Sequence, residues 1–241
     1  MRPFRRELKF LIHHSVKRTL LERWRRHLVP APHTNEHAVS PILSQYYDSP
    51  TYDFYHEKLA GIRLRNKVRV RTYGTAFRAG QATFIEIKHR EDDRVRKYRH
   101  QVARFEASTL DPARWEIDDP IVESAVVALR ERYSIAPSAQ VYYQREAYQG
   151  LVESDVRVTF DSSVIALHPG ERPSRRTLFH PARRLLPDTL VILEVKATGT
   201  IPGWVHDGVV AFELEQRTLP KYVTAVTALG LVDLGRAGAC A

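Results

Sequence analysis

Three cations at alternating positions, Lys67, Arg69 and Arg71, form the most suggestive pattern for chemistry in the sequence. Side chains two residues apart on a β-strand project from the same face, so these cations share one side while the β-branched residues between them share the other. β-Branched residues favour a half-buried pleated surface. Arginine offers a planar fork for two phosphate oxygens, and lysine offers a movable point charge. The pattern indicates a strand that presents cations to a phosphate-containing ligand.

The same alternation of charged and apolar residues recurs along the chain. The cations that it assigns to polar strand faces, together with one in the first turn of the last predicted helix, are Lys9, Lys67, Arg69, Arg71, Lys88, Arg145, Arg157, Lys196 and Lys221. Unpaired buried cations are costly, so a set this regular predicts an antiparallel sheet closed around a water-filled interior that holds a polyanion. An open sheet with a solvated charged face is the alternative.

Three glutamates, Glu7, Glu86 and Glu194, interrupt this cationic set. They are either ion-paired supports or ligands of a hard divalent cation, which uses one or two carboxylates together with phosphate oxygens and water. Glu194 is the best candidate for the metal ligand, because it lies between two apolar residues and is followed directly by Lys196. For Glu7 and Glu86 both readings stay open.

Length and composition set the remaining bounds. The 241 residues carry a net charge of +9, which predicts an anionic partner and permits nucleic acid, an anionic membrane or a polyphosphate. We expect one domain over residues 1–234 and a flexible tail over residues 235–241, which contains the single cysteine, Cys240. No apolar run approaches the ~20 residues of a membrane helix, so a cytoplasmic location is the default expectation.

Helices are expected around residues 15–28, 55–59, 120–133, 209–214 and 220–229, and residues 168–188 resist a regular assignment. The strand expected over residues 94–100 has cations on both faces. The sequence therefore leaves open whether Arg96 or the pair of Lys97 and Arg99 belongs to the ligand-binding face.

A set of segments in a fixed order carries a family resemblance. These are Tyr46 to Pro50, Tyr52 to Leu59, Val68 to Gly74, Phe84 to Lys88, Tyr142 to Tyr148, Arg157 to Asp161, Leu193 to Lys196, Pro202 to Trp204 and Pro220 to Tyr222. Together they resemble the catalytic domain of the vacuolar transporter chaperone (VTC), the polyphosphate polymerase branch of the triphosphate tunnel metalloenzymes. The resemblance implies an α+β fold with a closed antiparallel eight-stranded tunnel barrel and helices packed outside. It also implies transfer of the γ-phosphoryl of ATP to a growing polyphosphate chain, with Mn²⁺ or Mg²⁺.

The resemblance also distributes roles among the residues. It carries phosphate contacts over to Lys9, Arg69, Arg71, Lys88, Arg145, Arg157, Lys196 and Lys221, and the metal to Glu194. Among all the candidate cations, we expect catalytic contacts from Lys9, Arg69, Arg71, Lys88 and Lys221 and substrate phosphate contacts from Lys67, Arg145, Arg157 and Lys196, with Glu7 and Glu86 as candidate supporting carboxylates. ATP and polyphosphate are the expected partners, and nucleic acid is not expected. The regulatory and membrane segments of eukaryotic relatives are not found in the sequence, so a membrane-associated partner stays open.

Two other functions remain as alternatives. One is a tunnel-type triphosphatase acting on tripolyphosphate or a nucleoside triphosphate. The hydrolytic relatives carry Glu-x-Glu-x-Lys in the first strand, whereas here Arg5 precedes Glu7 and Lys9, which argues against hydrolysis. The other is a polyphosphate or nucleic-acid binder without catalysis.

Overall fold

The computed structural model describes residues 5–32, 34, 38–92 and 94–233. The chain forms two compact units, the first from residues 1–41, 143–164 and 186–219 and the second from residues 42–142, 165–185 and 220–241. The single domain expected over residues 1–234 stays a prediction, and the expected tail with Cys240 lies outside the described residues. No helix within the described ranges is long and apolar enough to cross a membrane.

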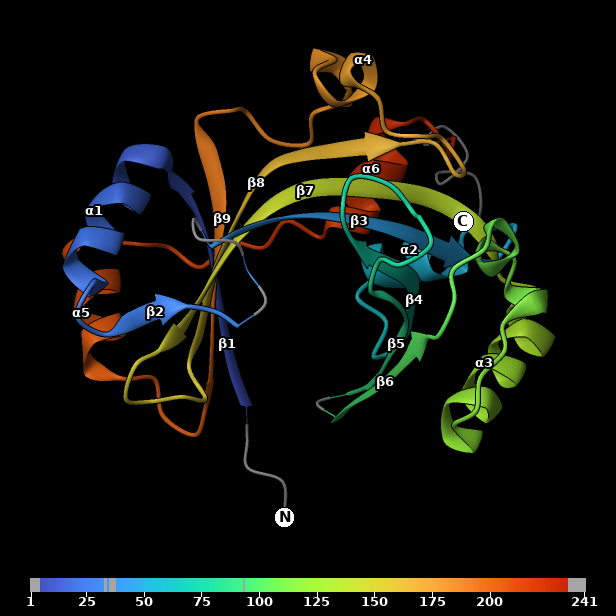
Figure 1. The fold of residues 1–241 in the computed structure, drawn as a ribbon, viewed down its shortest axis with the longest axis horizontal. Coiled ribbons are helices and arrows are strands. Elements are labelled where there is room, and N and C mark those ends of the chain that lie inside the picture. Colours follow the sequence, from blue (N-terminus) through green and yellow to red (C-terminus); the bar gives the residue numbers. More distant parts are fainter. Residues whose placement is uncertain (1–4, 33, 35–37, 93, 234–241) are drawn as a thin grey trace, which may run out of the picture. The chain divides into compact units, whose positions relative to one another are not determined.

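The strands form one antiparallel sheet, which can be followed in Figure 1. They are β1 (Arg5–His13), β2 (Leu28–Pro30), β3 (Val39–Asp48), β4 (Leu64–Tyr73), β5 (Thr83–Glu91), β6 (Arg94–Val102), β7 (Ala136–Gly150), β8 (Arg157–Leu167) and β9 (Leu190–Thr198). The order across the sheet is β1-β9-β8-β7-β3-β4-β5-β6, and β2 pairs with β7.

Most of the helices lie where the sequence predicts them. They are α1 (His14–Trp24), α2 (Asp53–Leu59), α3 (Pro120–Tyr133), α4 (Arg175–Leu178), α5 (Gly203–Ala211) and α6 (Lys221–Ala228). The expected helix over residues 120–133 is confirmed. The helix expected over residues 209–214 begins earlier, at Gly203, and the irregular segment 168–188 contains the single turn of α4.

The expected closed eight-stranded barrel is wrong. The α+β class is correct, but the sheet has nine strands and is open, with β1 and β6 at the two ends of its order. Alternation along a strand determines the two faces but not whether the last strand pairs with the first. Strand β6 has Arg96 exposed on one face and Lys97 and Arg99 exposed on the other, and its Tyr98 and Val102 are only partly buried against the core of β4 and β5.

In the first unit, α1 and α5 cover the apolar face of β1, β8 and β9 (Figure 1). Leu20 and Trp24 of α1 are fully buried against this face. Helix α5 approaches α1 closely at Gly208, where a Cβ atom would lie 2.7 Å from the Trp24 ring. Trp24 Nε1 also donates a hydrogen bond of 2.9 Å to the carbonyl of Trp204. This packing turns the polar sides of β1 and β9 away from the helices.

In the second unit, α2 and α3 pack on the apolar face of β4 and β5. Val68 and Val70 are completely buried there, whereas Lys67 and Arg69 on the same strand are only partly buried. The predicted division of this strand into an apolar and a cationic face is therefore confirmed.

Asp48, at the end of β3, holds two helices of the second unit in place. One carboxylate oxygen accepts from the backbone N–H groups of Ser49 and Phe54 at 2.8 and 2.9 Å. The other accepts from the N–H of Tyr55 at 3.0 Å and from the hydroxyl of Tyr222 at 2.5 Å. Burial raises the pKa of Asp48, although the hydrogen bonds from Tyr222 and these N–H groups act in the opposite direction. The carboxylate thus joins β3 to α2 and α6.

We expect Asp48→Asn to lower the free energy of unfolding by about 2 kcal/mol, because the amide places a donor against groups that themselves donate. Tyr222→Phe removes a single donor and should cost about 1 kcal/mol. Urea unfolding followed by circular dichroism measures both values. If Asp48→Asn were as stable as the unsubstituted protein, Asp48 would not be the anchor described here.

Candidate phosphate-binding site

Glu86 organises the polar face of β4, β5 and β6. Its carboxylate lies 2.6 Å from Arg69 Nη2 and also accepts from Arg69 Nε at 2.7 Å. Arg71 Nε and Arg99 Nε each lie 3.6 Å from the same carboxylate. Burial raises the pKa of Glu86, but the charges of Arg69, Arg71 and Arg99 outweigh it and lower the pKa to about 2. A single ionised carboxylate therefore positions three guanidinium groups on one face.

Tyr46 of β3 contacts this cluster. Arg69 Nη1 lies 3.4 Å from its hydroxyl, and Lys67 Nζ lies 5.1 Å from the centre of its ring. Burial disfavours the phenolate, but the charges of Lys67, Arg69 and Arg71 lower the pKa of Tyr46 to about 7. The phenol thus titrates near neutral pH because of the cations around it.

Lys67 shows how concentrated the positive charge is. Burial is the largest cause that lowers its pKa to about 8, and the charges of Arg69, Lys221 and Lys88 lower it further, while Tyr46 opposes them. The structure therefore brings together in the second unit five of the cations expected from the sequence: Lys67, Arg69, Arg71, Lys88 and Lys221. A phosphate group is a suitable counter-charge for such a cluster.

The first unit contains a second charged cluster, formed by Glu7, Lys9, Glu194 and Lys196 on the paired strands β1 and β9. Lys9 Nζ lies 2.5 Å from Glu7 and 3.7 Å from Glu194. Lys196 Nζ lies 3.8 Å from Glu7 and also pairs with Glu194. Each lysine therefore contacts both carboxylates, and the predicted neighbours Glu194 and Lys196 are in direct contact.

The oxygen atoms of this cluster are of the kind that a hard divalent cation binds. Glu7 and Glu194 supply carboxylates, and Thr159 lies directly opposite Glu194 on β8. The Thr159 hydroxyl is buried and makes no hydrogen bond within the described residues. No group of three or more His, Cys, Asp or Glu side chains that could hold a metal occurs in those ranges, so such an ion would complete its shell with phosphate oxygens and water.

Arg145 and Arg157 of the first unit differ in their surroundings. Arg145 forms a bidentate pair with the fully buried Asp161, at 2.6 Å through Nε and 2.7 Å through Nη2. Arg157 is exposed and lies opposite Lys196 in the pairing of β8 with β9. Arg145 is thus fixed by a carboxylate that compensates its charge, whereas Arg157 adds a further cation next to Lys196 of the Glu194 cluster.

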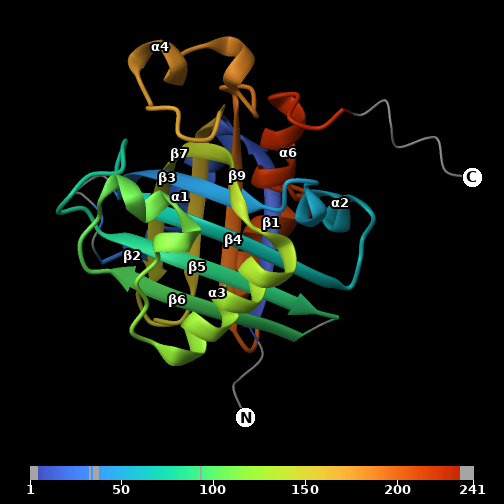
Figure 2. The ribbon, with the colours of Figure 1, turned by 90° about the vertical axis from the view of Figure 1, so that its right-hand side faces the viewer.

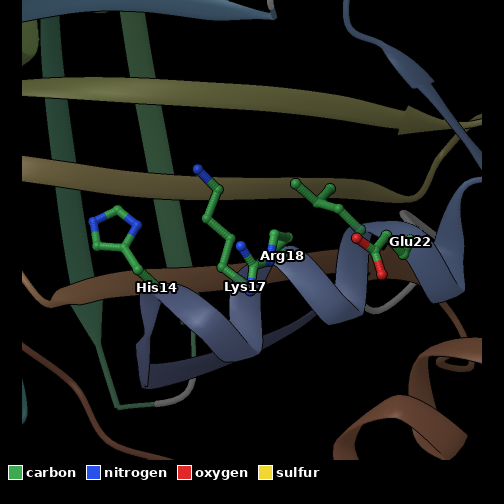
Figure 3. A pocket seen from close by; sticks show the side chains of 5 residues that line it. His14, Lys17, Arg18 and Glu22 are labelled. Atoms are coloured by element: carbon green, nitrogen blue, oxygen red, sulfur yellow. The ribbon is translucent and has the colours of Figure 1, made fainter.

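A surface hollow of about 410 Å³ on α1 lies apart from these predicted residues. Its lining residues are His14, Lys17, Arg18, Leu21 and Glu22. Figure 3 shows that the labelled side chains all come from this one helix. Lys17 pairs with Glu146 of β7. None of the cations expected to bind phosphate lines this hollow, so we place the candidate site on the sheet.

Comparison with known families identifies the family of this chain. The family model of the VTC domain matches residues 4–230. The chain belongs to the VTC domain family. This family is part of the triphosphate tunnel metalloenzyme superfamily, so membership supports nucleotide or phosphate chemistry and, in general terms, a phosphoryl-transfer enzyme whose family usually uses divalent metals. No curated protein matches the sequence.

Two solved structures are similar to this VTC domain at low sequence identity, and the first supports a shared fold. One is a crystal structure from Bacillus halodurans, provisionally described as an adenylate cyclase, with 12% identity and a TM-score of 0.53. That match covers 90% of this chain and 93% of the other. A protein from Pyrococcus horikoshii OT3 has 14% identity and a TM-score of 0.45, over 93% and 98% of the two chains.

Sequence reasoning missed three residues of the site. Tyr46 was named as part of the family resemblance and was given no role, and only its contact with Lys67 and Arg69 reveals its position. Asp161 was likewise named in that resemblance and was not recognised as the partner of Arg145. The sequence also left the orientation of Arg99 open, which the contact with Glu86 now resolves. Each of these depends on register between strands, which alternation within a single strand does not contain.

The low pKa values of Tyr46 and Lys67 predict how anion binding depends on pH. Between pH 6 and pH 9, Tyr46 gains a negative charge and Lys67 loses a positive charge. The affinity for tripolyphosphate should therefore fall more steeply with pH than in Tyr46→Phe, where only Lys67 titrates. We expect Tyr46→Phe to bind equally well at pH 6 and at most about threefold more tightly at pH 9, because losing the phenolate removes one repulsive charge but also lowers the pKa of Lys67.

Isothermal titration calorimetry at the two pH values measures this ratio, and the titration of tripolyphosphate itself cancels between the two proteins. Tyr73→Phe is the matched control, because Tyr73 is a largely exposed tyrosine at the end of β4. An affinity ratio that does not change with pH would show that Tyr46 stays neutral.

Proposed function

We propose that this VTC domain is a polyphosphate polymerase, which transfers the γ-phosphoryl of ATP to the end of a polyphosphate chain. The observation that carries the proposal is the VTC-domain match over residues 4–230, a range that includes every cation assigned to phosphate binding. The two clusters around Glu86 and Glu194 support it, because both combine phosphate-binding cations with carboxylates.

The residues of the two clusters have the properties that phosphoryl transfer requires. Reaction depends mostly on positioning and on stabilising charge, and the terminal phosphate of a polymer is already ionised near neutral pH. Arg69 and Arg71 offer guanidinium groups that Glu86 holds in place, while Lys67, Lys88 and Lys221 add point charges. No strong general base is needed, so the lack of a Ser, His and Asp constellation among the predicted residues is consistent with the proposal.

In the first unit, we assign Lys9, Lys196 and Arg157 to phosphate oxygens, with Arg145 held in position by Asp161. Glu194, with Glu7 beside it, would hold Mn²⁺ or Mg²⁺. Such an ion, when bound, neutralises charge on the phosphate oxygens that it contacts. Lys9 and Lys196 contact these carboxylates. Phosphate oxygens bound to such an ion would therefore lie near both lysines.

Hydrolysis of tripolyphosphate or a nucleoside triphosphate is the second candidate, because it needs the same cations and the same metal. One feature of the first strand argues against it: a single glutamate, Glu7, precedes Lys9, and Arg5 occupies the position of the other. Incubation with ATP and Mn²⁺ separates the two activities. A polymerase releases ADP and forms a ladder of polyphosphate on a gel, whereas a triphosphatase releases orthophosphate without a ladder.

We expect Glu194→Gln to slow polymer formation by about two orders of magnitude or more, because it removes the negative charge that a divalent cation requires. The fold should persist, since glutamine keeps the size of the side chain. Binding of tripolyphosphate without metal should persist or tighten, because Lys9 and Lys196 lose a competing carboxylate.

Product formation across a Mn²⁺ titration, together with metal-free tripolyphosphate binding, measures these effects. Glu91→Gln is the control, because Glu91 is an exposed carboxylate at the end of β5. Full activity of Glu194→Gln would assign the metal to Glu7 or Glu86 instead.

A further inference from the structure

A row of lysines crosses three neighbouring strands of the second unit. Lys67 of β4 lies opposite Lys88 of β5, and Lys88 lies opposite Lys97 of β6. Residues directly opposite each other in antiparallel strands project from the same face, and like charges at such positions destabilise the sheet. An anion bound along the row would relieve this electrostatic repulsion. The row therefore points to an anion-binding site.

The adjacent row on the same face is Arg69, Glu86 and Arg99. Its one carboxylate already faces the guanidinium groups of Arg69 at 2.6 Å, Arg71 at 3.6 Å and Arg99 at 3.6 Å. One negative charge is thus shared among three cations, which leaves this part of the face with a surplus of positive charge. The lowered pKa of Lys67, to which burial and its cationic neighbours contribute, agrees with that surplus.

The geometry of Arg99 shows that this face continues to the edge of the sheet. The Arg99 guanidinium lies 3.7 Å from the centre of the Phe84 ring and next to Glu86, so it is held on the face that carries Lys88. Lys97, two residues earlier on β6, projects from the same face and is exposed. Figure 2 shows β4, β5 and β6 in succession, and β6 ends the order of the sheet.

We propose that Lys97 and Arg99 form a binding site for the part of a polyphosphate chain that lies away from its reacting end, so that the chain crosses β5 and leaves over β6. This inference rests on the proposed function, because it takes linear polyphosphate as the ligand. Neighbouring strands are ~4.8 Å apart, so the lysine row extends roughly 10 Å across the sheet. A short phosphate ligand bound at Arg69 and Arg71 leaves Lys97 without contact, whereas a long chain reaches it.

Strand β6 offers a matched set of variants for testing this site. Lys97→Gln and Arg99→Gln each remove one cation from the proposed path. Arg96→Gln removes the same charge from the opposite face, where Arg96 lies opposite His89. All three residues are exposed, so the variants are expected to fold, and their melting temperatures serve as the check.

Binding to tripolyphosphate and to a long linear polyphosphate is measured without ATP and at several salt concentrations. We expect Lys97→Gln to weaken binding of the long polymer about fivefold and to leave tripolyphosphate binding unchanged. Arg99→Gln also removes a partner of Glu86, so it is compared with the unsubstituted protein for the long polymer alone, where we expect at least the same loss. The plot of log affinity against log salt should become shallower by about one for the long polymer, because one fewer counterion-releasing contact is made. Arg96→Gln should behave like the unsubstituted protein.

Three results would overturn the proposal: equal loss of affinity for both ligands in Lys97→Gln, an equal loss of long-polymer affinity in Arg96→Gln, or no loss in Lys97→Gln. If the unsubstituted protein makes polymer while Lys97→Gln binds the long chain normally, the path over β6 is wrong and the proposed polymerase stands. If the binding pattern appears but ATP yields no polymer, the polymerase is wrong and the site remains. If the unsubstituted protein binds neither ligand, both the proposed polymerase and the proposed site on β6 are wrong.

Discussion

The arrangement of this protein depends on a shortage of negative charge on the polar face of its sheet. Cations occupy alternate positions on strand after strand, and few carboxylates are available to hold them. Glu86 serves Arg69, Arg71 and Arg99, while Glu7 and Glu194 share Lys9 and Lys196. Burying a charged group without a partner costs free energy, so these carboxylates determine the positions of the cations on the face. The surplus that remains is what makes the face suited to an anion.

The same pairs explain why the expected barrel is not needed to accommodate the charges. The sequence alone predicts that many half-buried cations require an enclosed interior filled by a polyanion. In the structure Arg145 is held by Asp161 and Arg69 by Glu86, so part of the cost is met within the sheet itself. An open sheet whose charged face is partly compensated satisfies the same alternation. The sequence pattern was therefore compatible with both topologies.

How much the sequence could predict follows from the range of the interactions involved. The two faces of β4 and the helix at Pro120–Tyr133 depend on spacing within one segment, and both were predicted correctly. The direct contact of Glu194 with Lys196 also followed from their alternate positions on one strand. Three features depend instead on pairing between segments far apart in the chain. They are the role of Tyr46, the partner of Arg145 and the orientation of the Arg99 side chain. Alternation leaves those registers undetermined, so no reading of single strands could supply them.

The cations of β6 have a second consequence, for the behaviour of many copies in solution. A strand that ends a sheet presents backbone N–H and C=O groups that can pair with the same strand of another molecule. Arg94, Arg96, Lys97 and Arg99 are exposed along β6, so two such edges repel each other. A polyanion that neutralises this edge also removes the repulsion. The ligand expected to occupy the face would then promote self-association along β6, and the colloidal stability of the protein would depend on how much polyanion it carries.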